Sequence, residues 1–219
     1  MHQAEITLYG YYFSSTSYRA RILLNLKQLT YDTIDIRLDK GAQHDAEFKS
    51  LNPMGAVPVL KVGELSLVQS QAISDYLDET YPEPRLVPLE AEPRQRVREI
   101  TALISCDIHP VNNLRVLKHL RSEHQFDDSK IAAWYRLWIE QGFGALESLL
   151  QATSDSGRFC VGDMVSMADV FLIPQIANAR RFDIPLDQYP TIVSIDKHCQ
   201  TIPAFADAHP SRHVPADKQ

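Results

Sequence analysis

The sequence has few cysteines and no long apolar run. It contains only three cysteines, Cys106, Cys160 and Cys199, and no CxxC pair that would offer a zinc or dithiol site. Three widely spaced cysteines fit a reducing compartment better than a disulfide framework. No apolar run reaches the roughly 18 residues that a membrane-spanning helix needs, and the first residues lack the layout of a signal peptide. We therefore expect a cytoplasmic protein with no membrane partner and no metal.

The sequence also lacks an excess of positive charge. Its formal net charge is −6, which disfavours nucleic acid as the main partner, although a local basic pocket could still bind a small anion. Apolar residues make up 44% and charged residues 23%, as in an ordinary globular protein. A chain of 219 residues is long enough for one large or two small domains with a real core.

The first third of the chain alternates between strand and helix patterns. Short apolar runs bounded by turn residues predict strands, and apolar residues at helical spacing predict helices between them. The predicted strands cover 6–9, 31–36, 57–60 and 65–68, and the predicted helices cover 19–29, 42–50 and 69–81. This order indicates a small mixed sheet, which we assign to a first domain over 1–82.

The rest of the chain reads as helical. Prolines at 82, 84, 88 and 93 cannot lie in one continuous helix, so we expect a linker over 83–93 and a second domain over 94–219. The predicted helices cover 94–121 with a kink at Pro110, 130–150, 167–181 and 190–199, before a loose tail over 209–219. Ser166 and Asp169 have the spacing of a capping box.

Four hydroxyl side chains follow the first predicted strand, where a helix should begin. The segment reads Ser14-Ser15-Thr16-Ser17. A helix start carries unpaired N–H groups and about half a positive charge, so these hydroxyls either cap the helix or bind an anion there. Ser70, after Gln69 at a later helix start, allows the same two interpretations. Pro58 follows Val57 at the entry to a strand, and these three places together favour a shared anion pocket.

The chain resembles the cytosolic glutathione transferases over nearly its whole length, and most closely the zeta class, which includes the maleylacetoacetate isomerases. The segments that carry this resemblance are 14–22, 51–60, 69–70, 107–114 and 161–169. The Ser-rich first segment is specific to the class, whereas the Val57-Pro58 and Gln69-Ser70 pairs occur in the wider superfamily. The stretch 109–113 looks most like the bacterial members of the class.

The resemblance implies an α/β plus all-α fold, with a thioredoxin-like N-terminal domain followed by an all-helical C-terminal domain, in a homodimer. It also implies a cis Val57–Pro58 bond, whereas the residues alone favour trans. The implied cofactor is glutathione, with Ser14, Ser15 and Thr16 as catalytic groups at its sulfur. The residues that would hold glutathione are Ser14, Ser15, Thr16, Gln43, Val57, Gln69, Ser70, His109, Asn113 and Arg115, and those facing the substrate are Phe13, His109 and Arg181.

The implied activity is glutathione-dependent cis–trans isomerisation of maleylacetoacetate to fumarylacetoacetate in aromatic amino-acid breakdown. Hydroxyl donors and a helix start stabilise a thiolate and so lower the pKa of a bound thiol. The thiolate adds to the cis double bond, the resulting single bond rotates, and elimination leaves the trans product and regenerates glutathione. A serine or threonine hydroxyl in this role acts as a hydrogen-bond donor, not as a nucleophile.

The sequence departs from the family pattern at two positions. Thr16 stands where the family usually has Cys or Ala, and Phe13 stands where many relatives carry an arginine that meets a substrate carboxylate. Arg181 matches a family arginine near the substrate, although it also fits a surface cation at a helix end. Three alternatives therefore stay open: a maleylpyruvate isomerase, a general transferase acting on small electrophiles such as haloacids, and a non-catalytic binding module.

Overall fold

The protein is described by a computed structural model that covers residues 5–152 and 157–218. Its contacts divide the chain into two compact units. One unit comprises the chain up to Arg85 together with the segment from Ile202 onward, and the other is Leu86–Thr201. The boundary after Arg85 falls inside the predicted linker 83–93. The segment from Ile202 onward differs from the prediction, which placed it in the second domain.

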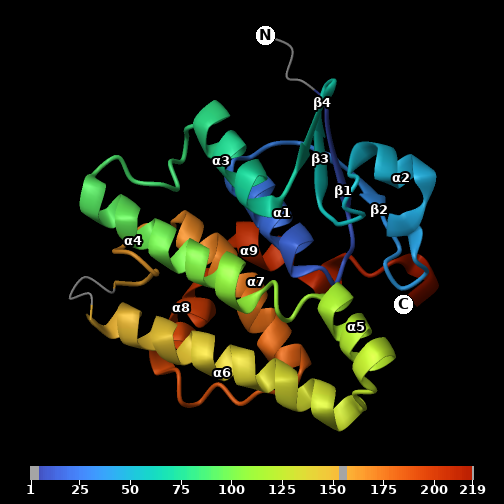
Figure 1. Ribbon diagram of the computed structural model, residues 1–219. Helices are drawn as coiled ribbons and strands as arrows, with labels where there is room; N and C mark the ends of the chain where they lie inside the picture. The colour runs from blue at the N-terminus through green and yellow to red at the C-terminus, as the bar shows by residue number, and fades with distance from the viewer. Residues whose placement is uncertain (1–4, 153–156, 219) are drawn as a thin grey trace. The chain divides into compact units, whose positions relative to one another are not determined.

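The first unit is built on a four-stranded sheet with the order β2-β1-β3-β4 (Figure 1). β1 pairs parallel with β2 and antiparallel with β3, and β3 pairs antiparallel with β4. This mixed sheet with its helices confirms the predicted thioredoxin-like fold. The strands are β1 (Ile6–Gly10), β2 (Asp32–Asp35), β3 (Val59–Val62) and β4 (Leu65–Val68). The helices before residue 85 are α1 (Ser15–Leu26), η1 (Ala42–His44), α2 (Ala46–Leu51) and α3 (Ser70–Thr80).

The two faces of the sheet bury different residues because side chains alternate along a strand. Leu8 pairs with Leu60 across β1 and β3, and both are fully buried. Val59, one residue earlier on β3, packs instead with Phe48 of α2. Figure 1 shows α1 and α3 together on one side of the strands and α2 on the other. Burial on both faces fixes the strand register that positions the site.

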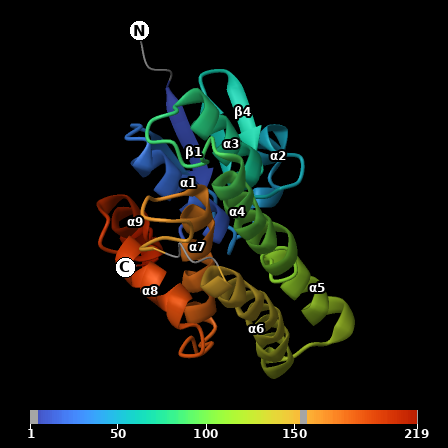
Figure 2. The same ribbon diagram turned by 90° about the vertical axis from the view of Figure 1, so that its left-hand side faces the viewer.

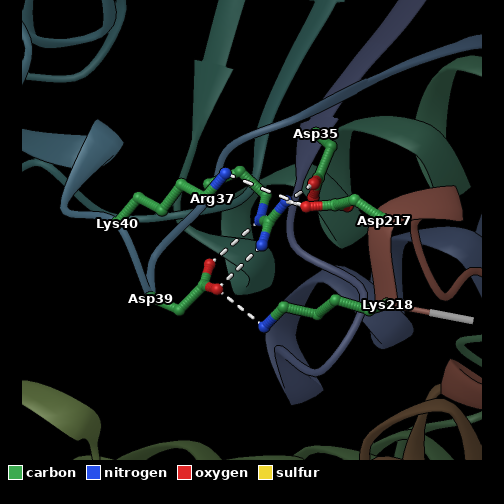
Figure 3. Close-up of polar contacts among 6 residues, drawn as sticks. All are labelled: Asp35, Arg37, Asp39, Lys40, Asp217 and Lys218. Atoms are coloured by element: carbon green, nitrogen blue, oxygen red, sulfur yellow. Dashed lines mark hydrogen bonds and ion pairs between the residues drawn. The ribbon is translucent and has the colours of Figure 1, made fainter.

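The end of the chain packs on α1 and is not the loose tail that the sequence predicted. Helix α9 (Pro203–Ala208) contacts α1, where Arg21 donates through Nε to the Ala208 carbonyl at 2.9 Å. Two short turns follow, Pro210–Arg212 and Ala216–Lys218. Asp217 accepts from Arg37 at 2.6 Å, as Figure 3 shows. These contacts hold residues 203–218 against the rest of the first unit.

The second unit is helical. Helix α7 is buried along most of its length and contacts α4, α8 and the π-helical turn η2 (Figure 2). A helix that is apolar all round belongs at the centre of a bundle. The helices are α4 (Ala91–Ala102), η2 (Leu103–Ile108), α5 (Leu114–His124), α6 (Asp128–Ala152), α7 (Met167–Arg181) and α8 (Pro190–Cys199).

Two boundaries in the second unit differ from the prediction. Helix α4 begins at Ala91, so Pro93 lies in its first turn, where proline costs no helical hydrogen bond. The predicted long helix 94–121 is two helices, because the chain passes through the π-helical turn and stops near Pro110. Asn113 then caps α5 by accepting from the Arg115 N–H at 3.1 Å.

The predicted capping box at the start of α7 is confirmed. The Asp169 carboxylate accepts from the Ser166 N–H and hydroxyl, both at 2.8 Å, and from the Cys160 N–H at 2.8 Å. Asp169 is fully buried, and burial raises its pKa above the usual range. Within residues 5–152 and 157–218, none of the helices has the length and apolar character that crossing a membrane requires.

Candidate functional site

The strand register brings the candidate site residues of the first unit to one end of the sheet. Tyr9 near the end of β1 pairs with Val59 at the start of β3, and Val59 pairs with Val68 at the end of β4. Because β3 runs antiparallel to both neighbours, the chain leaves β1 and β4 where it enters β3. The starts of α1 and α3 and the Val57–Pro58 bond therefore lie at this end.

The start of α1 is capped by Ser14. The Ser14 Oγ accepts from the Ser17 N–H at 3.2 Å, which is the N-cap predicted as one of two roles. The Ser14 and Thr16 hydroxyls lie 2.8 Å apart, and the Thr16 hydroxyl donates to the Val57 carbonyl at 2.9 Å. Thr16 thus joins the start of α1 to the residue that precedes Pro58. The Ser15 side chain is buried.

The Val57–Pro58 peptide bond is cis, as the family resemblance predicted. The loop before it passes close to Gln43, because a Cβ on Gly55 would lie 2.8 Å from the Gln43 carbonyl oxygen. Gly55 has φ +58, a conformation that favours glycine. The Gln43 side chain is buried, and its Oε1 has no hydrogen-bond partner in the described part of the chain. A buried acceptor in this state is suited to a ligand N–H group.

The start of α3 carries a buried serine with a buried cation behind it. Gln69 holds φ +68 and exposes its side chain, and Ser70 opens the helix as a buried residue. The Arg19 guanidinium donates to the Ser70 Oγ at 3.3 Å. Since the Ser70 oxygen accepts from Arg19, its own proton is directed elsewhere and can be given to an anion.

Arg19 is the site residue that the sequence prediction missed. It is 1% exposed, and burial lowers its pKa to about 9, so it stays charged at neutral pH. A charged residue at 19 falls three and four positions before Ile22 and Leu23, on the apolar face of α1. This position in the sequence could have identified Arg19, because a charged side chain on a buried helix face needs a polar partner.

The donor set of the first unit fits a peptide with negative charge at two places. Hydroxyls at the start of α1 suit one anionic atom, and Ser70 with Arg19 suits a carboxylate. Because β3 lies between β1 and β4, the Val57 main chain just before β3 lies between these groups. The Gln43 main chain lies near Gly55, in the loop before Val57. Among the described residues, no cluster of three or more His, Cys, Asp or Glu side chains is placed to hold a metal ion.

Four of the predicted site residues, His109, Asn113, Arg115 and Arg181, belong to the second unit. His109 Nε2 lies 3.4 Å from the Asn113 amide nitrogen. The Asn113 amide oxygen accepts the Arg115 N–H and so caps α5. Arg115 is exposed, and Arg181 is exposed at the end of α7 with its guanidinium 6.0 Å from the Phe182 ring centre. Phe13 lies in the first unit and is 40% exposed. The roles predicted for these residues stay predictions.

Comparisons with known proteins agree over nearly the whole chain. Residues 4–79 match the N-terminal domain of glutathione S-transferases. A probable maleylacetoacetate isomerase of Vibrio cholerae is 46% identical over 96% of this chain and 98% of that protein. The structure of a bacterial zeta-class maleylpyruvate isomerase is similar with a TM-score of 0.94 and 42% identity, over 97% of this chain and 100% of the other.

A further solved structure carries a ligand of direct interest. It is a maleylacetoacetate isomerase from Anaeromyxobacter dehalogenans with dicarboxyethyl glutathione and citrate bound in the active site. It is 35% identical with a TM-score of 0.87, over 100% of this chain and 98% of that one. That relative therefore binds glutathione carrying a dicarboxylic group.

Proposed function

Since the chain belongs to the glutathione S-transferase family, and within it to the zeta-class enzymes related to maleylacetoacetate isomerase, we propose that it uses glutathione to isomerise maleylacetoacetate to fumarylacetoacetate. The observation that carries this proposal is the hydrogen-bonded link from Ser14 through Thr16 to the Val57 carbonyl. This link puts serine hydroxyls at a helix start beside the main chain of a residue that precedes a cis proline.

The residues of the first unit fit glutathione from end to end. Ser70, supported by Arg19, would hold the γ-glutamyl carboxylate. The Val57 main chain would hold the cysteine residue, and the unpartnered Gln43 Oε1 would accept a peptide N–H. Ser14 would lie at the sulfur, where the N-terminal end of α1 favours negative charge.

Bound glutathione supplies a thiol whose reversible addition to a cis double bond allows rotation about that bond. The chain's own contribution is to hold negative charge at the sulfur position. A hydroxyl donor and a helix start together favour a thiolate over a thiol, because both interact more strongly with the charged form. The reaction consumes no proton and no electron overall, so no second cofactor is needed.

Three candidate substrates remain for the proposed reaction: maleylacetoacetate, maleylpyruvate and small electrophiles such as haloacids. A maleylpyruvate isomerase is the second candidate, because the solved structure with a TM-score of 0.94 is an enzyme of that name. Phe13 offers no charge to a substrate carboxylate, so we propose that Arg181 supplies one. An apolar Phe13 also suits small electrophiles such as haloacids, which would make the chain a general transferase.

The test is a coupled assay in which homogentisate dioxygenase generates maleylacetoacetate in place. Its loss is followed with and without glutathione, beside parallel assays on maleylpyruvate and on a haloacid. Fast loss of maleylacetoacetate only with glutathione supports the proposal. Faster turnover of maleylpyruvate or the haloacid would transfer the assignment to that substrate. If the folded chain binds glutathione but turns over none of the three substrates, the assignment becomes a non-catalytic binding module.

We also propose a homodimer, which the family resemblance implies. Light scattering at micromolar concentration should then give twice the 24.9 kDa mass of one chain. A mass near that of one chain would contradict the dimer. The measurement is independent of the assay, so the two proposals stand or fall separately.

We place the protein in the cytoplasm on the state of its cysteines. All three are free, with Cys106 exposed and Cys160 and Cys199 buried. Three cysteines that form no disulfide with one another fit a reducing compartment better than an oxidising one. Localisation of a tagged chain in cells tests this proposal.

A further inference from the structure

The Thr16 hydroxyl contacts both Ser14, which would lie at the glutathione sulfur, and the Val57 main chain, which would hold the cysteine residue of glutathione. Thr16 is half-buried near the start of α1, with its Oγ1 at 2.9 Å from the Val57 carbonyl oxygen and 2.8 Å from the Ser14 Oγ. Both distances are those of good O–H···O hydrogen bonds. The sequence prediction gave Thr16 the role of a donor at the glutathione sulfur.

Counting protons fixes the direction of both hydrogen bonds. A hydroxyl has one proton to donate, and a carbonyl has none. The proton of Thr16 must therefore go to the Val57 carbonyl, so Ser14 must be the donor in its contact with Thr16. The Ser14 oxygen also accepts from the Ser17 N–H at 3.2 Å. The Ser14 proton consequently points at Thr16.

This arrangement has a consequence for the acidity of a bound thiol. Ser14 can donate to a sulfur anion only by giving up its hydrogen bond to Thr16. The stabilisation that Ser14 gives to a thiolate is then the difference between two hydrogen bonds and not the whole of one. We propose that Thr16 is a positioning residue that sets the thiolate fraction of bound glutathione by competing for the Ser14 proton.

The branched side chain of Thr16 supports this role. Two heavy atoms on its Cβ restrict its χ1 rotation in a helix, so the Oγ1 stays aimed at Val57 and Ser14. A serine at 16 would keep the oxygen and proton with more rotational freedom. A valine would keep the shape of threonine and remove both hydrogen bonds.

The experiment titrates glutathione bound to the full chain by its thiolate absorbance in the ultraviolet. We compare the natural chain with Thr16→Val, Thr16→Ser and Ser14→Ala. In Thr16→Val the titration midpoint moves to lower pH, and the thiolate fraction below the midpoint rises about threefold or more. Thr16→Ser stays near the natural midpoint. Ser14→Ala moves it to higher pH, opposite to Thr16→Val.

Two results would overturn the inference. A midpoint that Thr16→Val leaves in place would mean that Thr16 does not compete for the proton. A midpoint that Thr16→Val moves to higher pH would mean that Thr16 itself donates to the sulfur, as the sequence prediction held. If the valine variant does not fold, Thr16→Ala replaces it, because it also removes the hydroxyl and should also move the titration midpoint to lower pH.

The inference rests on the proposed use of glutathione, and the experiment separates the two. Calorimetric titration gives the affinity of each variant for glutathione before its pH titration. A natural chain that does not bind glutathione contradicts the proposed function. A natural chain that binds it, with an unmoved midpoint in the Thr16 variants, contradicts only the role of Thr16.

Discussion

Adjacent hydroxyl side chains at the start of α1 have different partners. Ser14 caps the helix and donates to Thr16, and Thr16 donates to the Val57 carbonyl. Ser17 is buried, and its Oγ accepts from the Tyr11 N–H at 3.2 Å. The cap and the anion-binding role that the sequence left as alternatives are compatible, because a hydroxyl oxygen accepts and donates at once.

Ser14→Ala should reduce glutathione-dependent turnover at least tenfold, because it removes the donor that we place at the sulfur. The loss should fall on kcat, measured with saturating glutathione. The same change also removes a helix cap and lowers the free energy of unfolding by ~1 kcal/mol, which urea unfolding measures separately. Unchanged kinetics in the folded variant would assign the role at the sulfur to Ser15 or Thr16.

Arg19→Met should weaken glutathione binding about tenfold, or ~1.4 kcal/mol, because it removes the charge behind Ser70. Arg19→Lys keeps the charge and should recover part of the affinity. Calorimetry on glutathione and on an analogue with an amide in place of the γ-glutamyl carboxylate makes the test selective. Arg19→Met should lower the affinity for glutathione far more than for the amide. An equal loss for both ligands would show a structural role only.

At the scale of elements, local sequence patterns predict most strands and helices, but they do not predict where a helix is interrupted. The capping box at Ser166 and Asp169 needs only residues three apart, so the sequence predicted it correctly. The π-helical turn Leu103–Ile108 and the new start at Leu114 divide a segment predicted as one helix. Packing against other helices decides such a change of helix type, and a single sequence does not contain that information.

Gly142 on α6 marks a close approach to Ile108. A Cβ at 142 would overlap the buried Ile108 side chain, whereas a Cβ at Gly144 would have no atom within 4 Å. Gly142→Ala should therefore be destabilising, because overpacking of about 1–3 kcal/mol outweighs a gain in helix propensity of ~1 kcal/mol. Gly144→Ala is the matched control and should stabilise by up to ~1 kcal/mol. Urea unfolding of the two variants should show opposite signs, and equal signs would contradict the packing argument.

At the scale of the whole chain, the sequence predicted the sheet, the helical remainder and the cis bond at Pro58, the last through the family resemblance. It did not predict contacts between distant segments. Thr16 and Val57 are 41 residues apart, and Arg19 and Ser70 are 51 apart. Both contacts depend on β3 lying between β1 and β4, so they become visible only once the register is known.

The segment 202–218 is a further case in which the sequence did not predict contacts with distant residues. A polar segment with two prolines predicted a loose tail over 209–219, yet the His209 ring packs edge-on against Tyr18 of α1, with 5.9 Å between the ring centres. Helix α9, just before this segment, also packs on α1 through Phe205 and Ala208, which are both fully buried. Charged residues at the end then meet the loop after β2. Arg37 donates to both oxygens of Asp39, at 3.0 and 2.9 Å, and Lys218 donates to Asp39 at 2.6 Å (Figure 3).

This cluster makes the attachment of the chain end sensitive to pH. Hydrogen bonds from Arg37 hold the pKa of Asp39 and of Asp217 below the usual range. A carboxyl with a lowered pKa in the folded chain stabilises it above the pKa of the unfolded chain, which is about 4, and loses that effect as pH falls further. Amide hydrogen exchange over 202–218, corrected for the intrinsic rate, should therefore accelerate below about pH 4.

Asp39→Asn should produce the same acceleration at neutral pH, because the amide binds Arg37 and Lys218 without charge. Asp32→Asn is the matched control, since Asp32 is exposed on the neighbouring strand β2. Raised salt should reduce the difference between the natural chain and Asp39→Asn, since the cluster is open to solvent and its ion pairs are screened. Equal exchange in both variants would mean that the buried contacts of α9 alone hold the end of the chain, and that the charges around Arg37 add nothing to them.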